Sequence, residues 1–276
     1  MLTITTCLTY PEPPSNLLPL ADALTRDNIS TAFEPWQNRP KSAFILPLCA
    51  WDYAAEHEAF GQWLTEAEAC GQRFINPVGL MRWNMDKRYL RDLAEWGADV
   101  IPSVQTSSEK EKLEDILKNR GWWEAVVKPV IGQSGRGVAK IRAGEVSLKA
   151  GDYPQGVIVQ PYIREIETAG ETSLVFLDGQ FSHAVLRMPP QGEWRANSAY
   201  GVAVSPAAPP KKAIETARQI LDMLPEIPAY ARIDGTLIGD RLLLNELELV
   251  EPALYLHTAE NAVADMVQAV KRVIAG

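Results

Sequence analysis

Apolar and polar positions alternate in a regular order along the first third of the chain. Three short apolar runs are predicted as strands, at residues 2–8, 43–49 and 74–76. Between them, residues 17–26 and 54–70 carry apolar side chains at helical spacing, and in the second segment Phe60, Trp63 and Leu64 share one face. Strands that alternate with helices are typical of a parallel sheet covered by helices, which is an α/β arrangement.

The pattern changes from residue 83 onward, where strands and turns dominate. Helices are predicted at residues 84–96, 109–119, 211–224 and 259–274. Strands are predicted at 124–130, 137–142, 156–163, 172–177, 180–186, 229–238 and 241–250, with a loop at 189–210. Asp178-Gly179 and Gly239-Asp240 are turn dipeptides that join the last four strands into two hairpins. This part of the chain is predicted to be α+β.

Composition and charge exclude several classes of partner. The 276 residues are 46% hydrophobic and 22% charged, which is ordinary for a globular protein. The net charge of −8 provides no overall field that would attract nucleic acid or an anionic membrane. The sequence has no apolar run of the roughly 18 residues that span a bilayer, and its start does not resemble a secretory signal. We expect a cytoplasmic protein with no nucleic-acid and no membrane partner, whose three cysteines are buried thiols.

A glycine-rich segment between two predicted strands carries the first candidate chemistry. Its loop contains Gly132, Gln133, Ser134, Gly135 and Gly137. Glycines let backbone N–H groups crowd around phosphate oxygens, and Lys128 on the preceding strand can place a charge on the same phosphates. The segment is not a P-loop, because Val138 stands at the lysine position, and no helix follows it as in a dinucleotide fingerprint. A flexible hairpin loop is the alternative.

The closing hairpin carries the second candidate site. Side chains alternate faces along a strand, so Arg232 shares a face with Asp234, and Glu246 shares one with Glu248. A turn at Gly239-Asp240 pairs residues whose numbers sum to 479 or 480, which places Asp234 opposite residue 245 or 246. In the second register three carboxylates converge beside one arginine, and such oxygen ligands suit Mg²⁺. An exposed acidic face is the alternative, although the apolar neighbours indicate a buried strand whose carboxylates need partners.

Two other segments end where a ligand could be bound. The apolar strand at 156–163 reaches Pro161, where free backbone groups can pair with an adenine edge; taken alone, it is a buried strand followed by a loop. Trp51 and Asp52 follow a predicted parallel strand, and such sheets bind ligands at the carboxyl ends of their strands. Packing for Trp51 and helix capping for Asp52 are the alternatives.

In this order, the segments resemble the ATP-grasp superfamily, in its glutathione-synthetase-like branch. The motifs that carry the resemblance are Asp86-Lys87, Val127-Lys128-Pro129, the glycine-rich loop, Gln160-Pro161-Tyr162-Ile163, Glu171 with Ser173, Arg232-x-Asp234, and Glu246-x-Glu248 followed by Pro252. Members of this branch have Asn at the position of Glu248, so this chain adds a charge there. Almost the whole chain is also similar to the O-ureido-serine cyclo-ligases of D-cycloserine biosynthesis and their relatives.

The resemblance implies an ATP-grasp fold in three parts. These are an N-terminal α/β domain (1–82), a central subdomain with a glycine-rich lid (83–164), and a C-terminal subdomain with metal-binding strands (165–276). ATP would be clamped between the two subdomains by Lys87, Lys128, Gly132, Gln133, Ser134, Gly135, Gly137, Gln160, Pro161, Tyr162, Ile163 and Glu167. One or two Mg²⁺ ions, or Mn²⁺ in their place, would be held by Asp234, Glu246 and Glu248.

The resemblance also implies roles in catalysis and substrate binding. Arg232 is the candidate for stabilising the transferred phosphate, and Arg187 and Arg195 are candidates for holding a substrate carboxylate. On its polar loop, Arg195 could instead be solvated. His183 is a candidate general base, or it packs beneath Arg187. The candidate substrate contacts are Trp51, Asp52 and Ser173.

The implied activity is that of an ATP- and Mg-dependent carbon–nitrogen ligase that forms ADP. It would activate a small amino-acid-like carboxylate as an acyl phosphate for attack by an amine or amino-oxy nitrogen, between two molecules or within one. A small-molecule kinase on the same fold and a non-catalytic nucleotide-binding module are the alternatives, and a homo-oligomer is possible. Glu246→Gln or Asp234→Asn is expected to abolish ADP formation without disturbing the fold.

Overall fold

The N-terminal part of the computed structural model is a parallel four-stranded sheet in the order β2-β1-β3-β4. The structure describes residues 1–276, except the side chains of Ala150 and Ser198. The strands are β1 (Leu2–Thr6), β2 (Thr31–Pro35), β3 (Phe44–Leu46) and β4 (Arg73–Phe74), and the helices are α1 (Leu18–Arg26) and α2 (His57–Ala69). The predicted α/β arrangement is confirmed. Strand β2 is missing from the prediction because its sequence contains no run of apolar residues.

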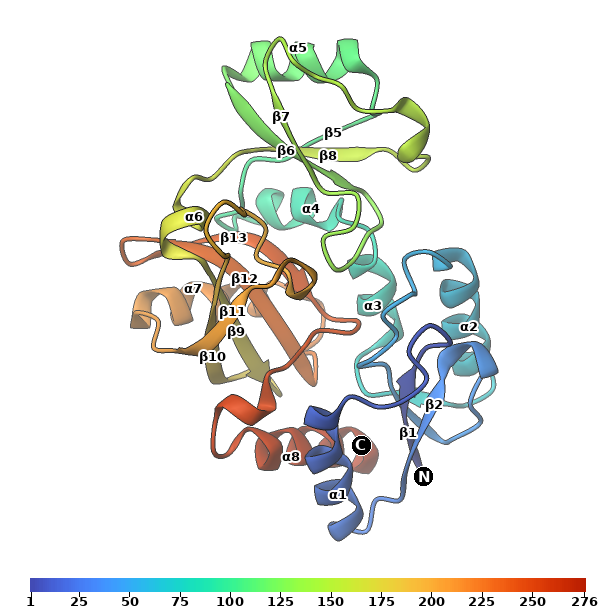
Figure 1. Cartoon of the computed structure of the whole chain (residues 1–276). Helices are drawn as coiled ribbons and strands as arrows, with labels where there is room; N and C mark the ends of the chain where they lie inside the picture. Colours follow the sequence, from blue (N-terminus) through green and yellow to red (C-terminus); the bar gives the residue numbers. More distant parts are fainter.

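The two ends of the chain share one hydrophobic core. Residues of β1, α1 and the C-terminal helix α8 (Ala262–Ala275) form a single cluster that includes Leu2, Ile4, Leu20, Leu24, Met266 and Val270. Figure 1 shows α1 and α8 side by side at the bottom of the molecule. Phe60, Trp63 and Leu64 of α2 are buried in a second cluster, as their spacing predicts.

The single helix predicted at 84–96 is wrong, because a turn divides this region. Helix α3 spans Val78–Asn84 and α4 spans Tyr89–Glu95. Between them, a carboxylate oxygen of Asp86 accepts a hydrogen bond from the backbone N–H of Arg88 at 2.9 Å, and the N–H of Lys87 donates to the carbonyl of Val130 at 2.9 Å. Side-chain acceptors of this kind compete with helical hydrogen bonds. The turn brings Lys87 against the central sheet.

The central part is an antiparallel sheet in the order β5-β8-β6-β7, drawn at the top of Figure 1. Its strands are β5 (Val104–Thr106), β6 (Glu124–Pro129), β7 (Ala139–Arg142) and β8 (Val157–Pro161), and α5 (Lys110–Arg120) covers it. The glycine-rich loop joins β6 to β7. Figure 1 shows it reaching down from the sheet toward α3. The predicted strand–loop–strand unit is confirmed.

The C-terminal part is an antiparallel five-stranded sheet in the order β11-β10-β9-β12-β13. Its strands are β9 (Glu171–Leu177), β10 (Gln180–Met188), β11 (Ala203–Ala207), β12 (Tyr230–Ile238) and β13 (Arg241–Glu248), with helices α6 (Glu165–Ala169) and α7 (Lys211–Asp222). Both predicted hairpins are confirmed, and Asp178 and Gly179 have φ values of 51° and 70°, which suit a primed turn. Strand β11 falls within the predicted loop, where it pairs with the edge of β10.

Short 3₁₀ helices complete the chain at Ser15–Leu17, Trp36–Asn38, Ala150–Asp152, Ser198–Tyr200 and Leu256–Thr258. Cys7 and Cys49 are buried as expected, whereas Cys70 is exposed at the end of α2. Among the described residues, no helix combines the length and the apolar character that crossing a membrane requires.

Candidate active site

A cavity of about 620 Å³ lies where the three parts meet. Its walls come from the glycine-rich loop, the end of β8, strands β12 and β13, and the loop after β3. A volume of this size is ordinary for a site that holds a small molecule or a nucleotide. The pairing of strands β12 and β13 places charged side chains along one wall of this cavity.

Three carboxylates converge at that wall, as the second predicted register requires. Glu246 and Glu248 line the cavity, and Asp234 lies buried behind them. Asp234 pairs with Glu246 across the hairpin, and Arg232 pairs with Glu248. One oxygen from each of Asp234, Glu246 and Glu248 lies within 4.8 Å of the others. A bulge next to Gly235 changes the register, because pairs beyond it sum to 479 and pairs at the acidic end sum to 480. Both registers considered from the sequence therefore occur in one hairpin.

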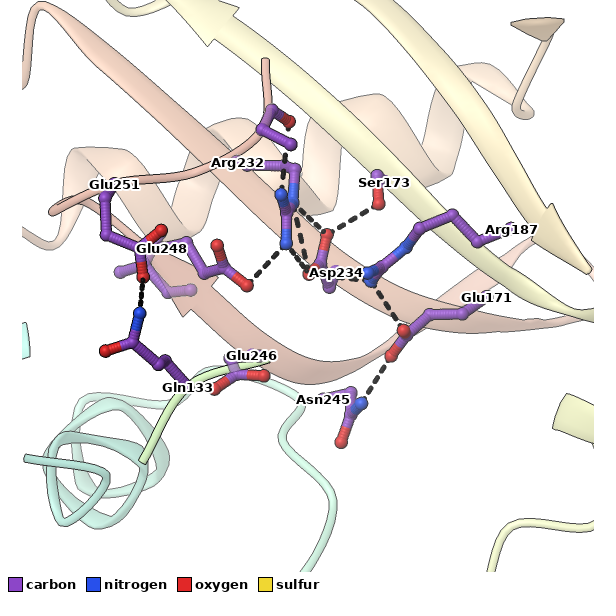
Figure 2. A network of polar contacts seen from close by, with 12 residues as sticks. Gln133, Glu171, Ser173, Arg187, Arg232, Asp234, Asn245, Glu246, Glu248 and Glu251 are labelled. Atoms are coloured by element: carbon purple, nitrogen blue, oxygen red, sulfur yellow. Dashed lines mark hydrogen bonds and ion pairs between the residues drawn. The ribbon is translucent and has the colours of Figure 1, made fainter. Parts of the chain in front are cut away.

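Two arginines flank the buried end of this cluster (Figure 2). The guanidinium of Arg187 lies 2.7 Å from Asp234 and 2.5 Å from Glu171. Arg232 donates to Asp234 at 2.9 Å and also pairs with Glu248. Burial raises the pKa of Asp234, but the two arginines outweigh it and lower the pKa to about 2. Asp234 is therefore a carboxylate anion held between two cations.

The donor set fits a divalent cation. Burial raises the pKa of Glu248 to about 7, and repulsion from Asp234 and Glu246 adds to it against the opposing effect of Arg232. The carboxylates thus repel one another, although Lys87, Arg187 and Arg232 pair with them. Carboxylate oxygens at this spacing are the ligands that Mg²⁺ prefers, and a bound cation would relieve the repulsion between facing strands.

The two predicted ATP lysines lie against the acidic cluster. Lys87 pairs with Glu246, and the Nζ of Lys128 donates to the side-chain oxygen of Asn245 at 2.6 Å. Burial lowers the pKa of Lys128, whereas the attraction of Glu246 outweighs burial and raises the pKa of Lys87. Both lysines line the cavity. Their ammonium groups stand where phosphate oxygens could replace their present partners.

The glycine-rich loop covers the cavity. The residues of the loop that line it include Gly132, Gln133, Ser134 and Gly135. Gly137 does not line it, and its carbonyl accepts a hydrogen bond from the Tyr153 hydroxyl. Gly135 has a φ of 71°, and a Cβ there would lie 2.6 Å from the side-chain oxygen of Asn197. Only glycine allows this close approach.

Gln133 joins the loop to both neighbouring parts of the chain. Its side-chain oxygen accepts a hydrogen bond from the backbone N–H of Ala54 at 2.8 Å, and its side-chain nitrogen donates to Glu251 at 3.4 Å. The loop is therefore in a closed position over the site.

Five of the predicted ATP-binding residues lie at or after the end of β8. The cavity is lined by Gln160, Pro161, Tyr162 and Ile163. Glu167 is not among the lining residues: it is exposed, it accepts a hydrogen bond from the Tyr162 hydroxyl, and it lies 3.8 Å from Lys140. This part of the prediction needs correction, because the short helix α6 turns Glu167 toward β7.

Three further predicted site residues do not face the cavity. Asp52 is buried and accepts hydrogen bonds from Trp36 at 2.7 Å and from Gln37 at 2.8 Å, so it fixes the loop after β3. Ser173 donates to Asp234 at 2.7 Å from within the sheet. His183 is buried and hydrogen bonded to the carbonyl of Leu254 at 2.9 Å, with its other ring nitrogen next to Ser182. These residues hold neighbouring groups in position.

Trp51 and Arg195 do line the cavity. Arg195 pairs with Glu193 at 2.7 Å, and its guanidinium lies 3.6 Å from the centre of the Tyr200 ring. It is therefore fixed at the cavity wall and not freely solvated.

The cavity also contains residues that the sequence pattern does not single out. They include Tyr10, Asn16, Trp194, Asn245, Glu251, Tyr255 and His257. Glu251 and Tyr255 follow β13, where strand alternation no longer applies. The two possible registers of the hairpin could have marked Asn245 as the unpaired residue, because a change of register leaves one residue of a strand without a partner.

Comparison with known proteins identifies the class. Residues 92–253 match the model of the prokaryotic glutathione synthetase ATP-grasp domain, and residues 2–76 match the N-terminal domain of D-cycloserine synthetase DcsG. Together with the fold and the site, these matches define an ADP-forming ATP-grasp ligase. More than half of the chain lies within the first match, and the chain belongs to the family of the prokaryotic glutathione synthetase ATP-grasp domain.

Individual relatives support the same assignment. The cycloserine biosynthesis protein DcsG of Streptomyces lavendulae is 30% identical over 223 residues, which cover 71% of this chain and 72% of that protein. The glutathione synthetase of Thermosynechococcus vestitus is 28% identical over 188 residues, which cover 64% of this chain and 54% of that protein. The chain thus spans about half the length of this glutathione synthetase.

Solved structures confirm the fold. The crystal structure of D-cycloserine synthetase DcsG matches with a TM-score of 0.84 at 24% identity, covering 99% of both chains. D-alanine–D-alanine ligase from Bacillus anthracis complexed with ATP matches with a TM-score of 0.67 at 14% identity, covering 99% of this chain and 97% of that one. The predicted ATP-grasp fold and family resemblance are both confirmed.

Proposed function

We propose that this ligase uses ATP to convert a small amino-acid-like carboxylate into an acyl phosphate, which an amine or amino-oxy nitrogen then attacks. The attacking nitrogen belongs to a second molecule or to the substrate itself, as in a cyclo-ligase. The observation that carries the proposal is the cluster of Asp234, Glu246 and Glu248. It lies at the wall of a cavity that is also lined by Lys87, Lys128 and Arg232. The similarity to DcsG supports the cyclising version.

The acidic wall and the lysines solve the first physical problem, which is that two anions must meet. Mg²⁺ held by Asp234, Glu246 and Glu248 would neutralise phosphate charge and orient the transferred group. Lys87 and Lys128 would bind phosphate oxygens after leaving Glu246 and Asn245. The number of metal ions and the use of Mn²⁺ belong to this proposal.

The arginines and the loop address the second step. Arg232 has one guanidinium nitrogen on Asp234 and another on the carbonyl of Ala253 at 3.1 Å, so its plane is fixed beside the acidic wall. A fixed cation at this place stabilises charge that develops on the transferred phosphate. The closed glycine-rich loop would exclude water, which otherwise hydrolyses an acyl phosphate.

We keep the division into three parts at 1–82, 83–164 and 165–276 as a proposal, and we add α8 to the N-terminal part. Helix α8 lies within the boundary 165–276 but packs in the core that contains β1 and α1. We propose that α8 anchors the C-terminal part to the N-terminal sheet.

The test of the proposed activity is a screen for ADP release with amino acids and amino-oxy acids, with the product mass recorded. A product lighter than its substrate by one water identifies cyclisation, and a product that combines two substrates identifies intermolecular ligation. A stable phosphorylated product would show a kinase and would contradict the proposal. ADP release that does not depend on a carboxylate substrate would contradict it as well.

Lys128→Ala is expected to weaken ATP binding by about 10- to 100-fold, because a charge-assisted hydrogen bond to phosphate is lost. Thermal stability in the absence of Mg²⁺ is expected to stay close to that of the wild type. Isothermal titration with ATP measures the first quantity and a melting curve the second. Lys118→Ala, on the exposed face of α5, is the control. An unchanged ATP affinity in Lys128→Ala would remove this lysine from the phosphate site.

A further inference from the structure

Glu251 is a carboxylate in the cavity wall without a cationic partner. It follows the end of β13 and lines the same cavity as the acidic cluster. Among the described residues, Glu251 accepts one hydrogen bond, from the side chain of Gln133 at the long distance of 3.4 Å, and it forms no ion pair. Lys128 of the wall donates to Asn245, whereas Lys87, Arg187 and Arg232 each pair with a carboxylate other than Glu251. A partly buried carboxylate without such a partner is costly in a protein.

Glu251 does not belong to the metal-binding set. The oxygens that lie within 4.8 Å of one another come from Asp234, Glu246 and Glu248. In Figure 2, Glu248 lies between Glu251 and Arg232, whereas Arg187 and Glu171 lie on the other side of Arg232. Arg232 is already bound to Asp234, Glu248 and the carbonyl of Ala253. None of the ion pairs among the described residues involves Glu251.

The surroundings of Glu251 suit a small organic cation. Trp51, Tyr53 and Tyr255 line the same cavity. Gln133 bridges Glu251 and the backbone N–H of Ala54, the residue after Tyr53, so the carboxylate lies on the Tyr53 side of the cavity. Burial first, and Glu251 next, raise the pKa of the Tyr53 hydroxyl. Aromatic faces attract cations, and a carboxylate next to aromatic rings recognises an ammonium group in two ways at once.

We propose that Glu251 binds a positively charged nitrogen of the small substrate and thereby selects carboxylates that carry a free amino group. This inference rests on the proposed function, because it places the reacting carboxylate near Arg232 and the metal-binding oxygens. Arg232 contacts the carbonyl of Ala253, two residues from Glu251, so both groups lie at the same end of the cavity. An amino acid carries both a carboxylate and an ammonium group, so one molecule offers a partner to each of these two sites.

The glycine-rich loop forms the roof of this subsite. Gln133 donates a hydrogen bond to Glu251 and accepts one from the backbone N–H of Ala54. Ala54 lies in the same loop as Trp51 and Asp52. A cation on Glu251 would therefore be enclosed by the loop when the loop is closed. Recognition of the substrate nitrogen and exclusion of water then occur at the same place.

The experiment compares matched ligands by isothermal titration into the protein loaded with ADP and Mg²⁺. The probes are the amino acids and amino-oxy acids of the activity screen, each tested beside its N-acetyl derivative, which lacks the cationic nitrogen. In the wild type the free amino form is expected to bind more tightly than its N-acetyl form. In Glu251→Gln this preference is expected to shrink by about 10- to 100-fold, because a hydrogen bond between charged groups is lost.

Three controls separate this role from a structural one. Affinity for ADP measures folding of the nucleotide site and is expected to be unchanged in Glu251→Gln. Glu251→Asp keeps the charge and is expected to keep part of the preference. Glu260 is an exposed carboxylate nine residues after Glu251, and Glu260→Gln is expected to behave as the wild type.

The outcomes distinguish this proposal from the proposed function. Equal binding of the free and N-acetyl forms by the wild type, or no binding of any cationic probe, would overturn the assignment of Glu251, and so would an undiminished preference in Glu251→Gln. If that variant does not fold, the wild type and Glu251→Asp decide the question. These measurements need no turnover, whereas the proposed function is judged by ADP release and product mass.

Discussion

Glu246→Gln is expected to lower ATP-dependent ADP release by about 10²–10³-fold, the usual cost of removing one preorganised charged group from a transition state. Glu246 supplies one of the three candidate metal-binding oxygens, and its carboxylate also pairs with Lys87. Glutamine keeps the shape and one oxygen acceptor for Lys87, but it removes the negative charge that attracts a divalent cation. The rate of ADP release and the affinity for Mg²⁺ are both expected to fall.

A matched control is available on the central sheet. Glu124 is another partly buried carboxylate that is surrounded by cations, with Arg164 at 3.0 Å and Arg142 at 3.2 Å. It lies outside the cavity wall. Glu124→Gln is therefore expected to leave ADP release close to that of the wild type. Full activity in Glu246→Gln would show that Mg²⁺ is not held by this hairpin.

The hairpin that carries the site could be predicted from the sequence because its turn fixes its register. Gly239-Asp240 limits the pairing of Asp234 to two partners, and the alternation of side chains does the rest. The structure contains both registers because Gly235 lies at a bulge, where a Cβ would stand 2.6 Å from the carbonyl oxygen of Leu243. No pattern of apolar residues marks such a bulge in advance.

Residues whose partners are distant in sequence could not be placed in the same way. The carboxylate of Asp52 is held by Trp36 and Gln37, and the ring of His183 by the carbonyl of Leu254. Such contacts depend on tertiary packing, so the spacing around each residue is equally compatible with a cavity-facing side chain. The turn at Asp86 illustrates the same limit, because a local side-chain hydrogen bond overrides helical periodicity.

Asp234→Asn is expected to lower the free energy of unfolding by about 3–5 kcal/mol when metal and nucleotide are absent, the usual cost of removing one partner from a buried ion pair. Arg187 and Arg232 are 4% and 5% exposed, and both donate to Asp234. A neutral asparagine removes the carboxylate that both guanidinium groups share and leaves each of them with one remaining anion, Glu171 for Arg187 and Glu248 for Arg232. The structure thus revises the expectation that this substitution would leave the fold undisturbed, and it makes Glu246→Gln the cleaner test of metal binding.

Urea unfolding followed by tryptophan fluorescence measures this effect, since the chain has 8 Trp residues. Glu66→Gln disrupts the exposed pair of Glu66 with Arg39 and is expected to cost less than about 1 kcal/mol. If Asp234→Asn costs no more than Glu66→Gln, the two arginines do not depend on Asp234 in the metal-free protein. The acidic wall would then be organised by its metal ion and not by the ion pairs of the sheet.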